Sequence, residues 1–449
     1  MKSYEIDMCN GSLWKKMMSF SVPLMFSNIL QVIFNMSDVA VVGRFAGASA
    51  LGAVGSTTIL ITLFTGILIG ISGGVNAIVA LYLGAKNEKA VKQSVHTGIF
   101  VCLFFGLLIT ILGITFARPI LKLMDTKEIL LSQAVQYFQI YLIGIPFLAL
   151  YNFGNAVLSA AGDTKRPLYY LSFAGIINIV LNLVFVIVLR LDVIGVGLAS
   201  VIAQIISAML IIVRLFRTDA AFGVRIKELK ISRVRMVQIL KIGVTSALQK
   251  SIFAVANIFV QRSVNSFDHI VVEGNSAAAN ADALIYDMMA AVYMAGTSFI
   301  AQNRGAGKKN RILKSYIICV IYSFGVGLIL GVGLYIFRYQ FLSLFTTESK
   351  VVDTGIKRLG IMAFSYCISA FMDGSIAALR GLGRSIGPTV VVILGSCVFR
   401  IVWICTVFAH FRTIESLYLL YSVSWTITGI AESLYFICVY RRLKCMPGD

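Results

Sequence analysis

Long apolar stretches recur along the whole chain, separated by short polar loops, and this pattern constrains the fold more than any other feature. A helix needs about 20 apolar residues to cross a lipid bilayer, and each stretch is long enough. The pattern therefore predicts an all-α integral membrane protein with twelve transmembrane helices. We expect these helices at residues 15–41, 51–83, 93–117, 131–159, 166–189, 193–214, 236–262, 276–303, 313–337, 353–379, 386–409 and 414–440.

The composition agrees with a membrane location. Of the 449 residues, 58% are hydrophobic and 13% are charged, whereas a soluble domain is about half apolar and about one quarter charged. These values exclude a soluble enzyme, a disordered hub and a secreted disulfide scaffold. The N-terminus shows no signal-peptide cleavage site, so we expect the first helix to be retained. With no CxxC motif and no histidine cluster, no cofactor or structural metal site is expected.

The formal net charge of +19 is explained by where the basic residues lie. Most lysines and arginines outside the predicted helices fall in the N-terminus, in the loops that follow the second, fourth, sixth, eighth and tenth predicted helices, and in the C-terminus. The largest group lies between Arg214 and Lys241. The positive-inside rule places these parts in the cytoplasm. We therefore predict a multi-pass protein of the cell (inner) membrane with both termini cytoplasmic. Because no loop is long enough for a soluble module, we expect contact with membrane lipids and not with nucleic acid.

Two polar loops of the first half have counterparts in the second half, and both pairs are separated by the same number of residues, the offset from residue 81 to residue 302. This constant offset indicates an internal repeat. Residues 81–95 (LYLGAKNEKAVKQSV) match residues 302–316 (QNRGAGKKNRILKSY). Residues 159–167 (SAAGDTKRP) match residues 380–388 (RGLGRSIGP) at the same offset. Gap-free agreement of two polar loops is not expected from chance similarity of apolar sequence.

Each repeat contains six predicted helices, so both enter the membrane in the same orientation. We expect two pseudo-symmetric six-helix lobes, at residues 1–220 and 236–449, joined by a cytoplasmic basic linker at residues 221–235. Parallel repeats of this kind occur in transporters that alternate access around a central cavity.

Several short segments, in order and in both halves, resemble those of the multidrug and toxic compound extrusion (MATE) family, and the likeness covers essentially the whole chain. They are the NMSD and VVGR runs within residues 35–44, the Gly-Ala loops at 84–85 and 305–306, and the segments at 162–164, 178–182, 195–200 and 379–383.

This resemblance implies a V-shaped pair of lobes around a central cavity. It also implies a secondary active transporter, and not an enzyme, that exports organic cations or amphipathic compounds in exchange for H+ or Na+ by alternating access. The residues do not choose between the two ions. We expect small-molecule substrates and a protein that works as a monomer.

The first helix carries a polar stripe that is suited to lining a cavity. Ser27, Gln31, Asn35 and Asp38 are spaced by four, four and three residues, so they share one face. Pro23, one turn earlier, is expected to bend the helix. Burial in the membrane disfavours a charged carboxylate, so Asp38 can take up a proton, whereas bound Na+ would keep it ionised. The alternative is a structural Asp that is hydrogen-bonded to a neighbouring helix.

The resemblance adds further site candidates in the first lobe. Asn178 and Asn182 lie one turn apart and are similar to a family pair that is often Asn then Asp. Because Asn182 cannot carry a proton, ion coupling in this lobe would rest on Asp38. Tyr137, Asn155 and Ser200 match polar positions around the family's first-lobe site, and packing between helices is the alternative role for each.

The second lobe offers acids within the predicted helices, namely Asp282, Asp287, Asp373 and Glu432. We consider the three aspartates as candidates for substrate or ion contact, and we expect Lys250 and Arg400 to pair with some of these acids. The acids outnumber these two bases, which favours a cationic cargo over the alternative function, a lipid-linked saccharide flippase of the same superfamily. A membrane-embedded enzyme would need a cluster of catalytic groups, which the sequence lacks.

Overall fold

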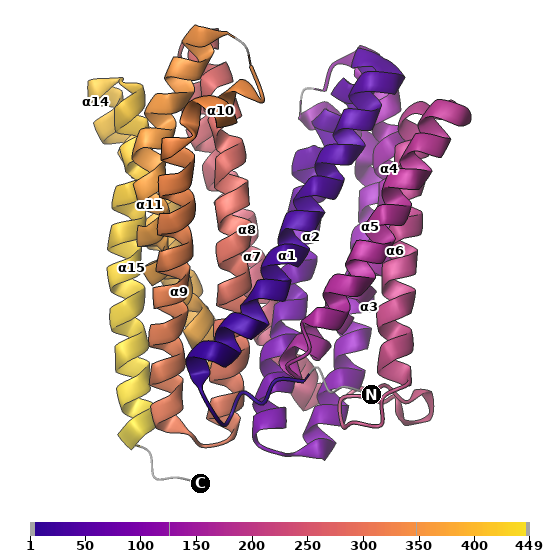
Figure 1. Cartoon of the computed structure of the whole chain (residues 1–449), viewed down its shortest axis with the longest axis vertical. Helices are drawn as coiled ribbons and strands as arrows, with labels where there is room; N and C mark the ends of the chain where they lie inside the picture. Colours follow the sequence, from indigo (N-terminus) through magenta and orange to yellow (C-terminus); the bar gives the residue numbers. More distant parts are fainter. Residues whose placement is uncertain (1–4, 125, 347, 446–449) are drawn as a thin grey trace. The chain divides into compact units, whose positions relative to one another are not determined.

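The computed structural model describes residues 5–124, 126–346 and 348–445, and these residues form helices and no strands (Figure 1). Twelve helical segments are long and apolar enough to cross a membrane, which confirms the predicted fold class. The long helices are α1 (Leu13–Val41), α2 (Gly47–Gly84), α3 (Glu88–Leu123), α4 (Glu128–Ala160), α5 (Lys165–Leu183), α6 (Asp192–Phe216), α7 (Arg233–Val264), α8 (His269–Gly305), α9 (Lys309–Ile336), α11 (Ser349–Gly381) and α15 (Ile414–Cys445).

The eleventh span is built from shorter pieces, because π-helical turns interrupt it. These pieces are α12 (Ile386–Val392), η4 (Ile393–Val398), α13 (Phe399–Trp403), η5 (Ile404–Phe408) and α14 (Ala409–Phe411). Two further π-helical segments, η1 (Val42–Ala46) and η2 (Val184–Val188), follow α1 and α5. A short helix α10 (Arg338–Ser343) and a 3-10 turn η3 (Ile226–Glu228) lie between spans.

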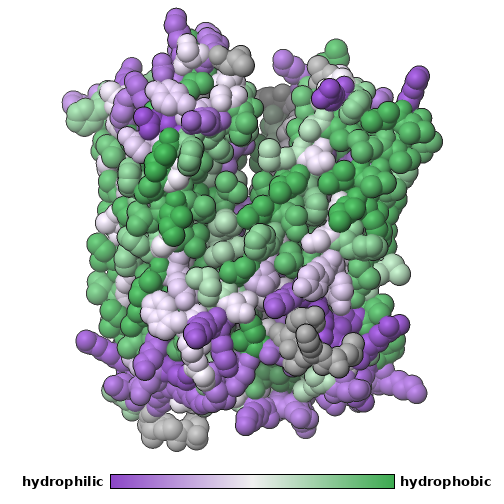
Figure 2. All heavy atoms as spheres, viewed as in Figure 1, coloured by the Kyte–Doolittle hydropathy of each residue, from purple (hydrophilic) through white to green (hydrophobic). Residues whose placement is uncertain are grey.

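The surface explains why such a chain is stable only in a membrane. Figure 2 shows hydrophobic side chains over the middle of the helices and hydrophilic side chains at their ends. Apolar groups that face lipid need no polar cover, and each helix satisfies its own backbone hydrogen bonds. The chain is therefore a multi-pass membrane protein.

The helices extend beyond the apolar stretches that predicted them. The largest difference is at α8, which begins at His269 and not at residue 276. Polar residues at a membrane interface can continue a helix, because backbone hydrogen bonding does not depend on the hydropathy of the side chain. Hydropathy alone therefore marks the middle of each helix better than its ends.

The chain forms two compact units that are not contiguous in sequence. Among the described residues, the N-terminal unit contains Phe26–Ala247 with residues 5–6, and the C-terminal unit contains Asp7–Met25 with residues 248–445. Each unit thus receives half of α1 and half of α7. These two helices are the first helix of each repeat, and both change units near their middle.

The repeat is also visible in the helix bounds. Helix α4 begins at Glu128 and ends at Ala160, and α11 begins at Ser349 and ends at Gly381, so α11 is as long as α4. Both ends are displaced along the sequence by the same offset as the polar loops. The internal repeat therefore extends from the loops into the helices.

Glycines allow the first half of α7 to approach α2 closely inside the N-terminal unit. A Cβ atom on Gly74 would lie 2.5 Å from the carbonyl oxygen of Ile239, and one on Gly70 would lie 2.6 Å from the amide nitrogen of Ala247. Any larger residue would force the two backbones apart. This explains part of the glycine-rich stretch in α2 as helix packing.

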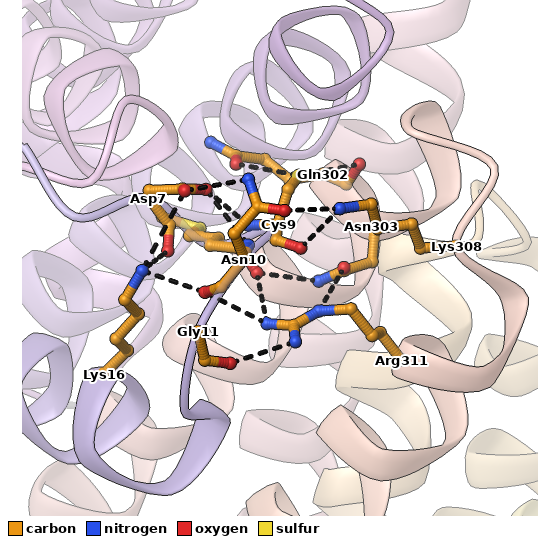
Figure 3. A network of polar contacts seen from close by, with 10 residues as sticks. Asp7, Cys9, Asn10, Gly11, Lys16, Gln302, Asn303, Lys308 and Arg311 are labelled. Carbon is orange, nitrogen blue, oxygen red and sulfur yellow. Dashed lines mark hydrogen bonds and ion pairs between the residues drawn. The ribbon is translucent and has the colours of Figure 1, made fainter.

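The segment before α1 is tied by polar contacts to the corner between α8 and α9 in the C-terminal unit (Figure 3). The Arg311 guanidinium donates to the carbonyl oxygens of Met8 (3.2 Å), Asn10 (3.4 Å) and Gly11 (3.0 Å). Lys308 Nζ donates to Asn10 Oδ1 at 2.7 Å. These contacts satisfy backbone carbonyls that no regular secondary structure pairs.

Candidate functional site

Asp38 lies at the centre of a buried polar cluster in the N-terminal unit. Its side chain is 9% exposed, and both carboxylate oxygens accept hydrogen bonds. Asn182 Nδ2 of α5 donates to Oδ1, and Ser200 Oγ of α6 donates to Oδ2 at 3.1 Å. Asn182 Nδ2 also donates to Asn178 Oδ1 at 3.3 Å. Three helices thus deliver one acid and three neutral polar groups to one place.

The local backbone favours such a cluster. Asp38 and Asn182 both lie within the last turn or so before a π-helical segment, η1 after α1 and η2 after α5. Such turns are frequent at functional sites. Tyr137 and Tyr141 of α4 complete the surroundings, since both lie close enough for the charge of Asp38 to act on their hydroxyl groups.

The oxygen atoms of this cluster fit a small cation or a proton. Asn182 Oδ1 is buried and has no hydrogen-bond partner in the described part of the chain. A buried oxygen without a donor is costly, and a coupling cation beside Asp38 would satisfy it. Carboxylate, amide and hydroxyl oxygens are suitable ligands for a hard cation.

Within the described ranges of the chain, other predicted residues of the first lobe make no hydrogen bond to this cluster. Gln31 and Asn35 are on the same face of α1 as Asp38 but are exposed. Asn155 lies five helical turns beyond Tyr137 on α4, a separation of about 27 Å along a helix. It accepts a hydrogen bond from Ser159 Oγ at 3.3 Å. Pro23 lies inside α1, shortly before that helix changes units.

In the C-terminal unit, Asp282 is an ion-pair partner. It pairs with the Arg358 guanidinium of α11 and also accepts a hydrogen bond from the Tyr366 hydroxyl. Arg358 is 4% exposed, so it is a buried base of this unit that sequence reasoning did not select. The base that pairs with Asp282 is thus Arg358, and not Lys250 or Arg400, the two bases that were expected to pair with some acids of this lobe.

The other three acids predicted for this lobe lie near two bases, Lys250 and Arg380. Lys250 interacts electrostatically with Asp287 and Asp373, while the Arg380 guanidinium donates to Gln249 Oε1 at 2.7 Å. Glu432 is completely buried. Because Arg358 and Arg380 also lie within a membrane-spanning helix, the excess of intramembrane acids that favoured a cationic cargo is largely removed.

Arg400 is the largest of the fully buried side chains, with an exposed fraction of 2%. Its Nη1 donates to Asn257 Oδ1 of α7 at 2.8 Å. Its guanidinium lies over the ring of Tyr421 at 4.6 Å and the ring of Phe253 at 5.4 Å. No ion pair in the described part of the chain includes Arg400, and Arg400 Nε has no hydrogen-bond partner there.

Sequence reasoning missed Tyr141 and Arg358 as parts of these clusters. The repeat could have identified Arg358, because its constant offset leads from Tyr137, which was already a candidate, to Arg358. Tyr141 lies one helical turn after Tyr137 and could have been found from that spacing. Among the described residues, no group of three or more His, Cys, Asp and Glu side chains could hold a metal ion.

Comparison with known families identifies this architecture. The family model MatE matches residues 23–184 and again residues 242–405. These two segments are one copy in each repeat and together cover well over half of the chain. The chain belongs to the MatE family. As a MatE protein it is a membrane transporter of the multidrug efflux type and not an enzyme.

Curated relatives of this MatE protein match it over most of its length. It is 27% identical over 418 residues to the probable multidrug resistance protein YoeA of Bacillus subtilis, covering 90% of this chain and 89% of YoeA. It is 30% identical over 375 residues to the probable multidrug resistance protein YpnP of the same organism, and the match covers 82% of this chain and 81% of YpnP.

Solved structures show the same fold. One of them is the outward-facing conformation of a multidrug resistance MATE family transporter of the MOP superfamily. It matches 99% of this chain and 100% of its own length with a TM-score of 0.93 and 20% sequence identity. The MatE fold is therefore retained although most side chains differ.

Proposed function

We propose that this protein exports small amphipathic compounds, organic cations among them, in exchange for H+ or Na+ by alternating access. The observation that carries the proposal is the Asp38 cluster. It is a buried acid whose two oxygens are held by Asn182 and Ser200, next to an amide oxygen without a partner. An isolated carboxylate in a membrane is expensive, so a site that holds one in a defined geometry is suited to binding and releasing an ion.

The coupling would act through competition between conformations. An ion that binds Asp38 more tightly in one conformation shifts the equilibrium toward it. If that conformation binds the cargo weakly, the bound ion lowers the affinity for the cargo. The bound cargo must then lower the affinity for the ion by the same factor. The division of α1 between the two units supports this, because Asp38 lies on a helix whose other half belongs to the C-terminal unit.

Two features support the cargo and the direction of transport. YoeA and YpnP are named probable multidrug resistance proteins, which favours drug-like small molecules over a lipid-linked saccharide. The basic residues between α6 and α7 support a cytoplasmic location for that loop in the cell membrane. The cargo would then leave the cell in exchange for an entering ion.

The test is coupled efflux from proteoliposomes with the variant Asp38→Asn. We expect ion-driven efflux of a fluorescent amphipathic cation to fall to the level of empty liposomes, because an amide cannot exchange a proton and binds a cation weakly. Asp192→Asn is the matched control. Asp192 is an exposed acid of the same unit, and its positive φ of 46° suits Asn. Unchanged coupled efflux by Asp38→Asn would overturn the role of Asp38.

Imposing a pH gradient and a Na+ gradient separately identifies the ion. Efflux that follows only one gradient assigns that ion, and efflux that follows neither would contradict ion coupling. Both measurements use the wild-type protein and therefore do not depend on the folding of a variant.

A further inference from the structure

Each repeat contains one buried charged residue at the meeting point of its first, fifth and sixth spans. In the N-terminal unit, Asp38 comes from the first helix of the repeat and is held by the fifth and sixth helices. In the C-terminal unit, Arg400 comes from the fifth span, is hydrogen-bonded to Asn257 of the first, and lies over Tyr421 of the sixth.

The sequence positions of the two clusters agree with this equivalence. Ser200 and Tyr421 are separated by the offset of the repeat. At the same offset, Arg400 falls between the positions of Asn178 and Asn182, and Asn257 falls two residues before the position of Asp38. The Arg400 cluster is therefore the counterpart of the Asp38 cluster, with the opposite charge.

Arg400 has no ion-pair partner in the part of the chain that the structure describes. Arg358, the other guanidinium near Tyr421 at 5.9 Å, is already paired with Asp282. Arg400 has one neutral hydrogen-bond partner and two aromatic rings but no acid within ion-pair distance among the described residues. A buried guanidinium without a counter-ion is costly in a membrane, so an incoming anionic group would be strongly favoured.

An exposed neighbour and partly exposed aromatic rings lie next to Arg400. Asn257 is exposed, so an anionic group can reach Arg400 by replacing the Asn257 amide. The π-helical segments η4 and η5 lie immediately before and after the five residues that contain Arg400. The rings of Tyr421 and Phe253 lie next to the guanidinium and are both partly exposed, so they offer aromatic surface beside it.

We infer that Arg400 and Tyr421 form an anion subsite, occupied in this structure by the Asn257 amide, that binds the carboxylate or phosphate of a planar aromatic cargo. This subsite deepens the proposed function, on which it rests, by naming a class of cargo: an aromatic compound with an anionic group. The guanidinium holds the anion, and Tyr421 with its neighbouring aromatic rings packs against the planar part. The subsite explains why a chain of this fold keeps an unbalanced arginine inside the membrane.

The test is equilibrium binding of two fluorescent probes to the purified full chain in nanodiscs. Flavin mononucleotide and riboflavin share one aromatic ring system and differ by a phosphate. We expect wild-type protein to bind flavin mononucleotide at least about tenfold more tightly, the difference supplied by one charge-assisted contact. Arg400→Gln should abolish that preference, and Arg400→Lys should keep part of it.

Two further variants keep the inference falsifiable if Arg400→Gln fails to fold. Arg262→Gln removes an exposed arginine from α7, the helix that carries Asn257, and should keep the full preference. Asn257→Ala removes the amide that the ligand replaces, so flavin mononucleotide should bind at least as tightly as to wild type. Equal binding of both probes by wild type, or a preference that survives Arg400→Gln, would overturn the subsite.

These outcomes are separate from those for the proposed function. Equilibrium binding requires no ion gradient, so the phosphate preference can be lost while Asp38-dependent efflux continues. Conversely, Asp38→Asn can abolish efflux while the preference for flavin mononucleotide remains.

Discussion

Arg358 of α11 and Asp282 of α8 form an ion pair inside the C-terminal unit, and each has a further polar partner. Arg358 Nη1 also donates to Asn275 Oδ1 at 2.5 Å, and Tyr366 donates to Asp282. The pair therefore joins α8 to α11 through a network whose members depend on one another. It neutralises two charges that would otherwise be isolated among apolar residues.

Breaking this pair should destabilise the protein strongly. Arg358→Met leaves Asp282 without its counter-ion, and we expect a loss of about 3 kcal/mol in the free energy of unfolding. The double variant Asp282→Leu with Arg358→Met removes both charges and should recover part of that loss. Thermal unfolding in detergent measures both. Equal melting temperatures for wild type and Arg358→Met would contradict the structural role of the pair.

The contact between α1 and α5 should respond to a single added methyl group. A Cβ atom on Gly175 would lie 1.9 Å from ring atoms of Phe34, so Gly175→Ala must displace that ring. We expect a loss of about 1–3 kcal/mol, measured by thermal unfolding, with partial recovery in the double variant that adds Phe34→Ala. The control is Gly55→Ala, since nothing lies within 4 Å of the added Cβ there. Equal losses in both single variants would contradict the contact.

The number and type of helices could be predicted from the sequence, because a bilayer requires about 20 consecutive apolar residues and every span shows them. Asp38 could be selected as an acid on a polar stripe, whereas Asn182 and Ser200 were selected through the resemblance to the family. The structure brings the three residues together. That Asn155 lies far from Tyr137 follows from their spacing of 18 positions on one predicted helix. Which of the two lies near Asp38 could not be foreseen, because polarity does not tell where along α4 the partner on another helix lies.

The burial of Arg358 was missed for a related reason. It lies near the start of a predicted helix beside Lys357, which is exposed. Both residues carry one positive charge, so counting basic residues along the sequence does not distinguish them. Their different environments follow from helical geometry, since adjacent residues point in directions about 100° apart. Only the partners on α8 show that one of them faces the interior.

The anchor of the N-terminal segment should depend on Arg311. Arg311→Ala removes the donors to the carbonyl oxygens of Met8, Asn10 and Gly11, so amide hydrogen exchange of residues 8–11 should accelerate at least about fivefold. Lys314→Ala, which truncates an exposed base one turn further along α9, should leave exchange unchanged. Equal protection in the two variants would show that Arg311 does not hold the segment.

The same segment should loosen in acid because of Asp7. Partial burial alone would raise the pKa of Asp7. Hydrogen bonds from the Asn10 side chain and the Cys9 and Asn10 amides, with the charge of Lys16, outweigh that effect and lower its pKa. A lowered pKa in the folded state stabilises the segment above the unfolded value of about 3.9, and this contribution is lost as the pH falls through the folded pKa.

Protection of residues 8–11 should therefore be constant from neutral pH down to about pH 4 and fall below it. Hydrogen exchange corrected for intrinsic rates measures this, with Asp7→Asn as the matched variant. An Asn side chain still accepts hydrogen bonds from the Cys9 and Asn10 amides but does not titrate, so the variant should show weaker protection without the acid-dependent loss. An acid-dependent loss of the same size in Asp7→Asn would assign the effect to another group.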